Sequence, residues 1–203
     1  MRVSYPLDDI FRNKNNVRIL RKLVMFPSMP FTGRGLASEL EMNHATCIRA
    51  LNSLVGMGII SRRTIGRSSI YEIPSDSVLL KDFLKPLFEK EADLLNNLVD
   101  VLIKGFKNNL MSVYLFGSVA RGEDTPQSDI DLLLILKAGI DNKKIGEILE
   151  RNEREVYRRY RIGINTLIYT FKEFERMKKD KHSLIREILA EGVLLMGKEQ
   201  SFG

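Results

Sequence analysis

The stretch that decides the fold begins Ser112-Val-Tyr-Leu-Phe116, continues with Gly117-Ser118 and a polar segment, and then reads Asp129-Ile-Asp-Leu-Leu-Leu-Ile135. Two β-prone runs enclose the polar segment, which predicts strand, turn, short helix and strand. Residues two apart in a strand project to one face, about 6.5 to 7 Å apart, so Asp129 and Asp131 should point the same way. Two aligned carboxylates can share divalent metal ions, which predicts a metal site at the start of the second strand.

The Gly-Ser pair adds a phosphate-binding element to this prediction. Gly117 lets the backbone approach a phosphate closely, and the Ser118 hydroxyl and the N–H groups of a helix start can hold phosphate oxygens. We therefore expect Asp129 and Asp131 to bind Mg²⁺ or Mn²⁺ and to supply the catalytic carboxylates, with Gly117, Ser118 and Arg121 binding a nucleoside triphosphate. Such a site would stabilise in-line displacement at the α-phosphate.

The order Gly117-Ser118, ten residues, then Asp129-Ile-Asp131 resembles the nucleotidyltransferases of the polymerase-β superfamily, in particular the minimal ones of prokaryotes. The resemblance implies an α/β nucleotidyltransferase fold with a small mixed sheet over residues 109–203. Apolar spacing there predicts a helix over 142–160, a strand over 162–169 and closing helices over 171–177 and 183–195.

One position departs from the family pattern. The resemblance implies a third carboxylate from a neighbouring strand, which completes metal binding and acts as general base. The strand predicted over 162–169 contains no acid, and Asn165 is the best candidate for that position. Asparagine is a neutral ligand and cannot accept the proton, so we expect nucleotide binding with weak or absent transfer. Glu173 follows this strand and is expected to cover a helix start.

The first third of the chain has a different pattern. Apolar positions at helical spacing predict helices over about 16–26, after Thr32-Gly33, and from Cys47 to a stop at Gly56, and β-prone runs around Gly66 predict a hairpin. Three helices followed by a hairpin make a winged helix-turn-helix domain over residues 1–74. The stretch resembles the winged-helix domains of small prokaryotic transcription regulators.

The face of the third helix opposite its apolar stripe carries side chains that can contact double-stranded DNA. Arg and Asn can pair bidentately with guanine and adenine edges, and arginines of the hairpin suit phosphate or minor-groove contact. The candidate DNA-binding residues are His44, Thr46, Arg49, Asn52, Ser53, Arg62, Arg63 and Arg67. A winged helix that docks a protein instead of DNA is the alternative.

A helical connector is predicted over residues 75–108. Pro86 fits the first turn of a helix, and apolar positions from Leu87 continue at helical spacing to Gly105, which predicts one long helix. Its broad apolar face can pack on its own C-terminal domain or form a homodimer with a second copy. The fold class is therefore α+β and multidomain.

Charge and composition limit the remaining possibilities. The 203 residues carry 32 Lys and Arg against 26 Asp and Glu, and residues 1–110 hold most of the excess. The apolar runs are far shorter than the roughly 20 residues that span a bilayer. The first residues contain no apolar segment of the kind found in signal peptides, so we expect a cytoplasmic protein without membrane contact.

Three functions remain open at this point. The first is a DNA-binding transcription regulator whose second domain binds a metal–nucleotide complex. The second is an active nucleotidyltransferase that moves NMP to a hydroxyl on a protein, a nucleic acid or a small molecule. The third is an antitoxin-like partner of a toxin.

Overall fold

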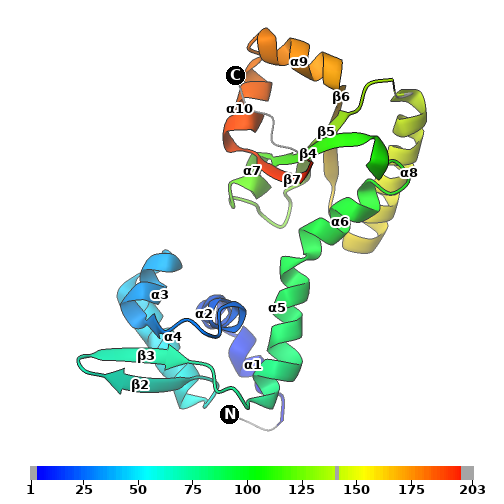
Figure 1. Cartoon of the computed structure of the whole chain (residues 1–203). Coiled ribbons are helices and arrows are strands. Elements are labelled where there is room, and N and C mark those ends of the chain that lie inside the picture. Colours follow the sequence, from blue (N-terminus) through cyan, green and yellow to red (C-terminus); the bar gives the residue numbers. More distant parts are fainter. Residues whose placement is uncertain (1–3, 140–141, 198–203) are drawn as a thin grey trace. The chain divides into compact units, whose positions relative to one another are not determined.

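The computed structural model describes residues 4–139 and 142–197, and the chain divides into two compact units between Asp93 and Leu94 (Figure 1). Each unit is a mixture of helices and a small sheet. Among the described residues no helix is both long enough and apolar enough to cross a membrane.

Unit 1 contains short helices around a three-stranded antiparallel sheet of order β1-β3-β2. Its elements are α1 (Pro6–Phe11), α2 (Lys14–Met25), β1 (Phe31–Thr32), α3 (Gly33–Glu39), α4 (His44–Gly56), β2 (Ser61–Ile65), β3 (Ser68–Glu72), a π-helical segment (Leu79–Leu84) and α5 (Lys85–Ala92). The succession from α2 to β3 is the element order of a winged helix, and the predicted helices and hairpin are confirmed. β1 and α1 were not predicted.

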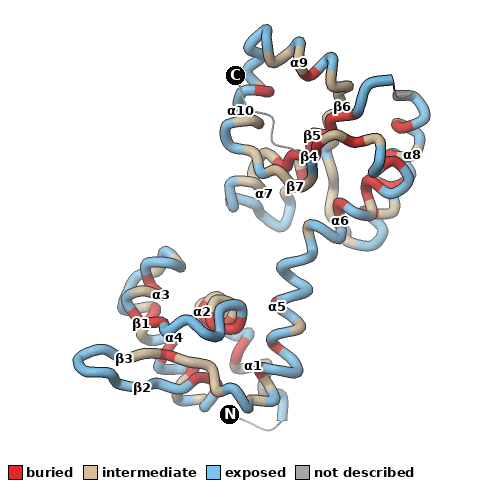
Figure 2. The backbone as a smooth tube through the Cα atoms, viewed as in Figure 1, coloured by how far each residue is buried: buried red, intermediate tan, exposed pale blue. Residues whose placement is uncertain are grey.

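Polar caps and one shared core explain the helices of unit 1. The side chains of Asn13, Thr32 and Asn43 each accept a hydrogen bond from a backbone N–H in the first turn of α2, α3 and α4. α2 and α4 bury their apolar sides, including Leu20 and Leu54, in this core. The opposite sides remain in solvent (Figure 2).

Cys47, the only cysteine of the chain, lies on the buried side of α4. Its side chain is fully buried, and burial raises the pKa of its thiol. The residue therefore packs as a small apolar side chain in the core of unit 1.

The predicted long helix over residues 87–105 is wrong. α5 ends at Ala92 and α6 (Leu94–Leu102) begins two residues later, with Asp93 between them. The apolar positions serve two cores, because Phe88 is buried in unit 1 whereas Leu98 and Leu102 are buried in unit 2. Pro86 stands in the first turn of α5, as expected.

Unit 2 is built on a four-stranded mixed sheet of order β6-β5-β4-β7. After α6 and a 3₁₀ turn (Lys107–Asn109) come β4 (Leu110–Phe116), α7 (Gly117–Ala120), β5 (Ile130–Leu136), α8 (Asn142–Tyr160), β6 (Ile164–Thr170), α9 (Phe171–Lys179), α10 (Ser183–Glu191) and β7 (Val193–Gly197). β5 and β6 are parallel, and the other pairs are antiparallel.

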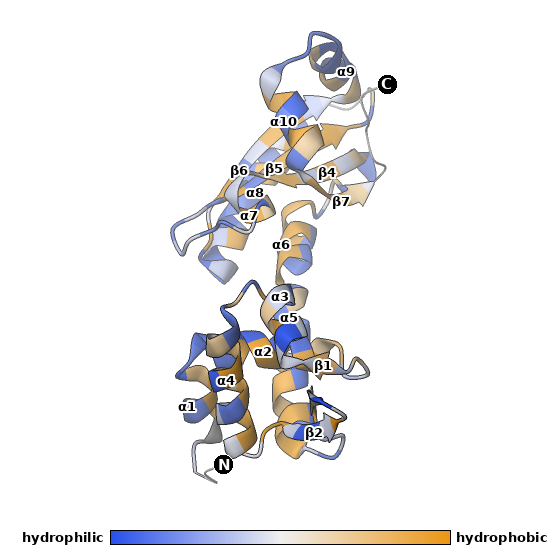
Figure 3. Cartoon of the chain, turned by 90° about the vertical axis from the view of Figure 1, so that its left-hand side faces the viewer, coloured by the Kyte–Doolittle hydropathy of each residue, from blue (hydrophilic) through white to orange (hydrophobic). Residues whose placement is uncertain are grey.

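The two faces of this sheet are covered by different helices. Alternate residues of β5 point to opposite faces, so Leu132 and Leu134 pack in the core with α6 and α8. Leu133 and Ile135 pack with Phe174 of α9 and residues of α10 in the other core. From Leu132 to Leu136, β5 is hydrophobic (Figure 3) and buried, which fits a central strand that is buried on both faces.

The predicted helix over 183–195 is wrong at its end. α10 stops at Glu191, and residues from Val193 onward form β7 against β4. A Cβ at Gly192 would stand 3.0 Å from the carbonyl oxygen of Leu115, so a glycine is needed where the chain turns onto the sheet. Helical spacing of the apolar residues could not reveal this, because β7 is defined by its long-range pairing.

Candidate functional site

Asp129 and Asp131 lie where β5 begins, beside the start of β6. The parallel register pairs Asp131 with Asn165 and Ile130 with Ile164. Asp129, Asp131 and Asn165 thereby share one face of the sheet, the face on which α9 and α10 pack. Asp129 stands one residue before β5, and Asn165 Nδ2 lies within 3.5 Å of a carboxylate oxygen of each aspartate.

Gly117 is fixed at this site by contact with Asp131. It follows Phe116, which pairs with Asp131 across β4 and β5. Its φ is 73°, a conformation that glycine adopts without cost. A Cβ at Gly117 would also overlap Oδ2 of Asp131, so only glycine lets the backbone come this close to the carboxylate. Ser118 follows in the first turn of α7.

Gly163 is a second glycine at the site, and the sequence did not indicate it. A Cβ at this position would overlap Oδ1 of Asp129. The Gly163 carbonyl oxygen accepts a hydrogen bond of 2.9 Å from the backbone N–H of Ile130, between the two aspartates. This role depends on the pairing of β5 with β6, so local spacing alone carries no signal for it.

Asn165 connects the two carboxylates. Its Nδ2 lies 3.0 Å from Oδ1 of Asp131 and 3.5 Å from Oδ2 of Asp129, as a hydrogen-bond donor to both. Among the described residues no group of three or more His, Cys, Asp or Glu side chains could hold a metal ion. Two carboxylates and one amide oxygen, which a flip of the Asn165 amide would present, are oxygen ligands suited to Mg²⁺ or Mn²⁺.

Arg121 points to acids of its own surroundings and not to the aspartate pair. Its Nε donates to Oε2 of Glu123 at 2.8 Å, and Nη1 lies 4.0 Å from Oε2 of Glu191. The hydrogen bond with Glu123 is the main reason that the pKa of Arg121 is raised. A phosphate that reached Arg121 would therefore compete with these carboxylates.

Glu173 has a structural role, as expected. Its carboxylate accepts hydrogen bonds from the N–H and hydroxyl of Thr170, while its own N–H donates to the Thr170 hydroxyl, which makes a capping box at the start of α9. The hydrogen bond from Thr170 lowers the pKa of Glu173. Glu173 is therefore already occupied at the helix start.

The predicted DNA-binding residues of unit 1 are almost all exposed, with only Thr46 half-buried. Arg49 donates to the Thr46 hydroxyl at 3.1 Å, and Arg63 is paired with Glu72 at 3.0 Å. His44 and Arg67 line one groove between α4 and the hairpin. The remaining predicted members are spread along α4 (Asn52, Ser53) and β2 (Arg62).

Arg34 at the start of α3 is a further cation of this groove, which the sequence did not single out. The turn between β2 and β3 contains Gly66, with a φ of 58°, and Arg67. Hydrophilic residues gather on this hairpin (Figure 3). The groove thus collects three basic side chains from three elements.

In unit 2, the Gly117-Ser118 turn lies against Asp131 at the start of the central strand β5. Residues 95–195 match the model of the nucleotidyltransferase domain family.

Comparisons with known proteins add one curated relative and two structures. A Methanocaldococcus jannaschii protein named "putative protein adenylyltransferase" is 28% identical over 105 residues, which are 52% of this chain and 97% of the relative. A crystal structure of the toxin–antitoxin pair MntA–HpeT is 17% identical with a TM-score of 0.38 and covers 52% of this chain and 74% of that one. Reduced HlyU of Vibrio cholerae is 20% identical with a TM-score of 0.36 and covers 45% and 86%.

Proposed function

We propose that the chain is a DNA-binding transcription regulator whose nucleotidyltransferase domain binds a Mg²⁺–nucleotide complex and has weak or absent NMP transfer. Asp129 and Asp131 hold the metal, and Gly117 and Ser118 hold the phosphates. Arg121 joins the phosphates after it leaves Glu123 and Glu191. The observation that carries this proposal is the contact of Gly117 with Asp131 beside an Asn165 that bridges both carboxylates.

Asn165 is the reason for favouring binding over transfer. A neutral amide can complete the coordination of one metal ion, but it adds no charge for a second ion and has no base to accept the proton of an attacking hydroxyl. The first acid after β6 in the sequence, Glu173, is engaged with Thr170. The domain is therefore equipped to bind a nucleotide more than to transfer one.

Replacement of Asp131 by Asn tests the nucleotide site. We expect calorimetric titration of ATP, GTP, CTP and UTP with Mg²⁺ to show binding of at least one nucleotide by the wild type. The Asp131→Asn variant should bind it about 100-fold less tightly, because a charged metal ligand is lost. Equal affinity in both proteins would refute the site, and absence of binding in both would leave DNA or protein binding as the function.

The second candidate function is NMP transfer. The match to the relative named as a putative protein adenylyltransferase covers 97% of that relative. This similarity favours a protein hydroxyl as acceptor and ATP as donor. Incorporation of α-labelled nucleotide into a protein by the wild type, but not by Asp131→Asn, would show that the chain is an active transferase.

DNA binding by unit 1 makes a separate prediction. Arg62→Ala and Arg67→Ala should each lower the salt dependence of binding to a mixed-sequence DNA duplex by about one unit of log K against log salt, because each removes about one phosphate contact. Lys90→Ala, which removes an exposed cation from α5 of the same unit, is the matched control and should change nothing. Fluorescence anisotropy between about 50 and 200 mM salt measures the slope.

Equal slopes for Arg67→Ala, Arg62→Ala and the control would count against the hairpin as a DNA contact. A winged helix that docks a protein would give that result.

A further inference from the structure

The last turns of α8 lie at the edge of the sheet that carries the aspartate pair. β5 and β6 are parallel, so α8 has to return the chain to the edge where both strands begin (Figure 1). Only residues 161–163 separate α8 from β6, and Gly163 contacts Asp129. The C-terminal end of α8 and the predicted nucleotide site therefore share one edge of unit 2.

This end of α8 is rich in arginine. Residues 151–161 contain five of the eight arginines of residues 94–203 and no lysine, against two acids. We call the five the α8 arginine cluster, and all are exposed: Arg151, Arg154, Arg158, Arg159 and Arg161. Planar guanidinium groups bind phosphates bidentately and stack on aromatic rings, which ammonium groups do not do.

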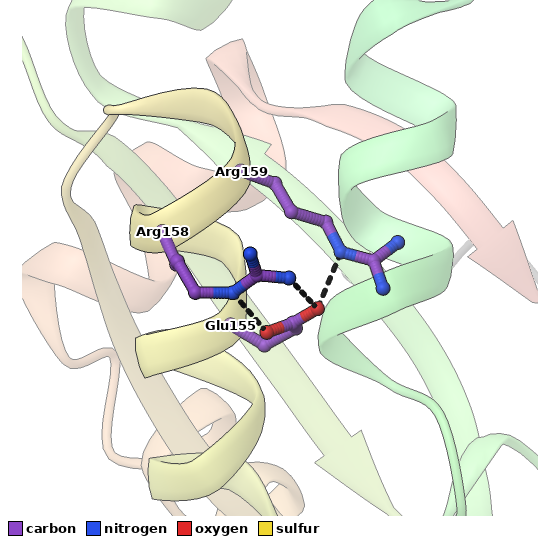
Figure 4. Close-up of polar contacts among 3 residues, drawn as sticks. All are labelled: Glu155, Arg158 and Arg159. Carbon is purple, nitrogen blue, oxygen red and sulfur yellow. Dashed lines mark hydrogen bonds and ion pairs between the residues drawn. The ribbon is translucent and has the colours of Figure 1, made fainter.

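One of the two acids lies inside the cluster and the other does not. Glu155 accepts from Arg158 Nε at 2.9 Å and from Arg159 Nε at 2.5 Å, so its carboxylate lies between the two guanidinium groups (Figure 4). These hydrogen bonds, first that of Arg158, lower the pKa of Glu155 to about 2. Glu153 instead accepts from the Thr166 hydroxyl of β6 at 2.7 Å. Glu155 is therefore ionised at neutral pH and accepts the hydrogen bonds of Arg158 and Arg159 there.

The other arginines are less engaged. Arg154 lies 3.8 Å from Glu150, a weak exposed pair. In the described part of the chain, Arg151 and Arg161 have no ion pair within 4.0 Å. The cluster therefore presents uncompensated positive charge on both sides of the pairs made by Glu155.

Tyr157 indicates which kind of anion this surface would bind. The residue is 58% exposed and lies on the same turns of α8, between the arginines in sequence. An exposed aromatic ring beside guanidinium groups gives bases a stacking partner and phosphates a charge partner, which is the combination that single strands use. An acidic peptide would use the charges but not the ring.

We propose that the α8 arginine cluster and Tyr157 bind a single-stranded nucleic acid and direct one end of it toward Asp129 and Asp131. The purpose of this placement rests on the proposed nucleotide site, whereas the binding itself does not. A bound phosphate would displace Glu155 from Arg158 and Arg159, so Glu155 limits the affinity of the surface.

Two triple variants of the full chain test the surface. Arg151→Gln/Arg154→Gln/Arg161→Gln removes three charges from the cluster, and Lys172→Gln/Lys179→Gln/Lys181→Gln removes three exposed charges elsewhere on unit 2. The triples are matched, because each contains one residue with positive φ, 58° at Arg161 and 53° at Lys181. The probe is a labelled single-stranded RNA of about 12 nucleotides, followed by fluorescence anisotropy.

The cluster triple should bind this RNA at least about tenfold less tightly and lower the salt slope by about two units, since each phosphate contact of a single strand contributes about 0.7. The lysine triple should bind like the wild type. Glu155→Gln should bind more tightly, because it frees two guanidinium groups and removes a repelling charge. Tyr157→Ala should weaken binding without changing the salt slope.

Each result has a consequence for the proposal. Equal losses in both triples, or unchanged affinity in Glu155→Gln, would overturn it, because a merely solvated basic surface behaves in that way. Competition by polyglutamate as effective as that by poly(U) would overturn it in favour of an acidic peptide. Nucleotide calorimetry and duplex DNA binding on the same variants should match the wild type, so a failure here is distinct from a failure of the nucleotide site or of unit 1.

Discussion

An Asn165→Asp variant is expected to bind Mg²⁺ or Mn²⁺ at least about tenfold more tightly than the wild type and to transfer NMP about 100-fold faster or more. Asn165 faces both aspartates, so a carboxylate at this position would add charge to the metal site and supply the missing proton acceptor. Isothermal titration with metal measures the first effect, and release of pyrophosphate from the nucleoside triphosphate measures the second.

The same substitution should destabilise the metal-free protein. A third carboxylate within 3.0 to 3.5 Å of the other two repels them, as the Asn165 distances to Asp131 and Asp129 show. Thermal unfolding should therefore shift down without metal and recover with Mg²⁺. Asn97→Asp on α6, which adds the same charge to an exposed position of unit 2, is the control. Unchanged metal affinity in Asn165→Asp would show that this position does not face the metal.

Gly117→Ala should abolish binding of the Mg²⁺–nucleotide complex, with an affinity loss of about 100-fold or more. Two costs combine at this position, namely the positive φ and the overlap of the new Cβ with Asp131. The backbone cost alone is roughly 1 to 2 kcal/mol. Displacement of the Asp131 carboxylate would remove a metal ligand in addition.

Gly122→Ala separates the two costs. Gly122 has a φ of 68°, close to that of Gly117, and a Cβ there would meet no atom within 4 Å. Both variants should lower the free energy of unfolding, as measured in urea, and Gly117→Ala should lower it more because of the overlap with Asp131, but only Gly117→Ala should lose nucleotide binding by calorimetry. Equal loss of binding in both would mean that backbone strain, and not contact with Asp131, explains the effect.

The sequence predicted the parts of the site that depend on local geometry. Asp129 and Asp131 could be aligned from strand periodicity alone, and the Gly117-Ser118 turn was recognisable because it directly precedes a helix start. The position of Asn165 was expected from the family resemblance, but its hydrogen bonds to both carboxylates follow from the parallel register of β5 and β6. Gly163 was missed because its contact with Asp129 arises only from that pairing.

Long-range contacts also explain the errors in the fold. The apolar residues from Val193 onward fit the periodicity of a helix as well as that of a strand, and only their pairing with β4 decides between the two. Apolar spacing does not predict the helix break at Asp93, because the apolar residues before it pack in the core of unit 1 and those after it pack in the core of unit 2. The pairing of Arg121 with Glu191 of α10 likewise follows from the fold and not from local spacing.

The buried thiol of Cys47 gives this protein a built-in probe of one unit alone. Since the chain has no other cysteine, a thiol-reactive reagent labels unit 1 and does not label unit 2. A fully buried side chain on α4 can react only when the helix leaves the core, so the labelling rate, relative to that of the unfolded chain, measures the free energy of opening. A ligand that binds only the folded form of unit 1 lowers the labelling rate, to an extent set by its concentration and its Kd. The labelling rate can therefore report duplex binding without any fluorophore.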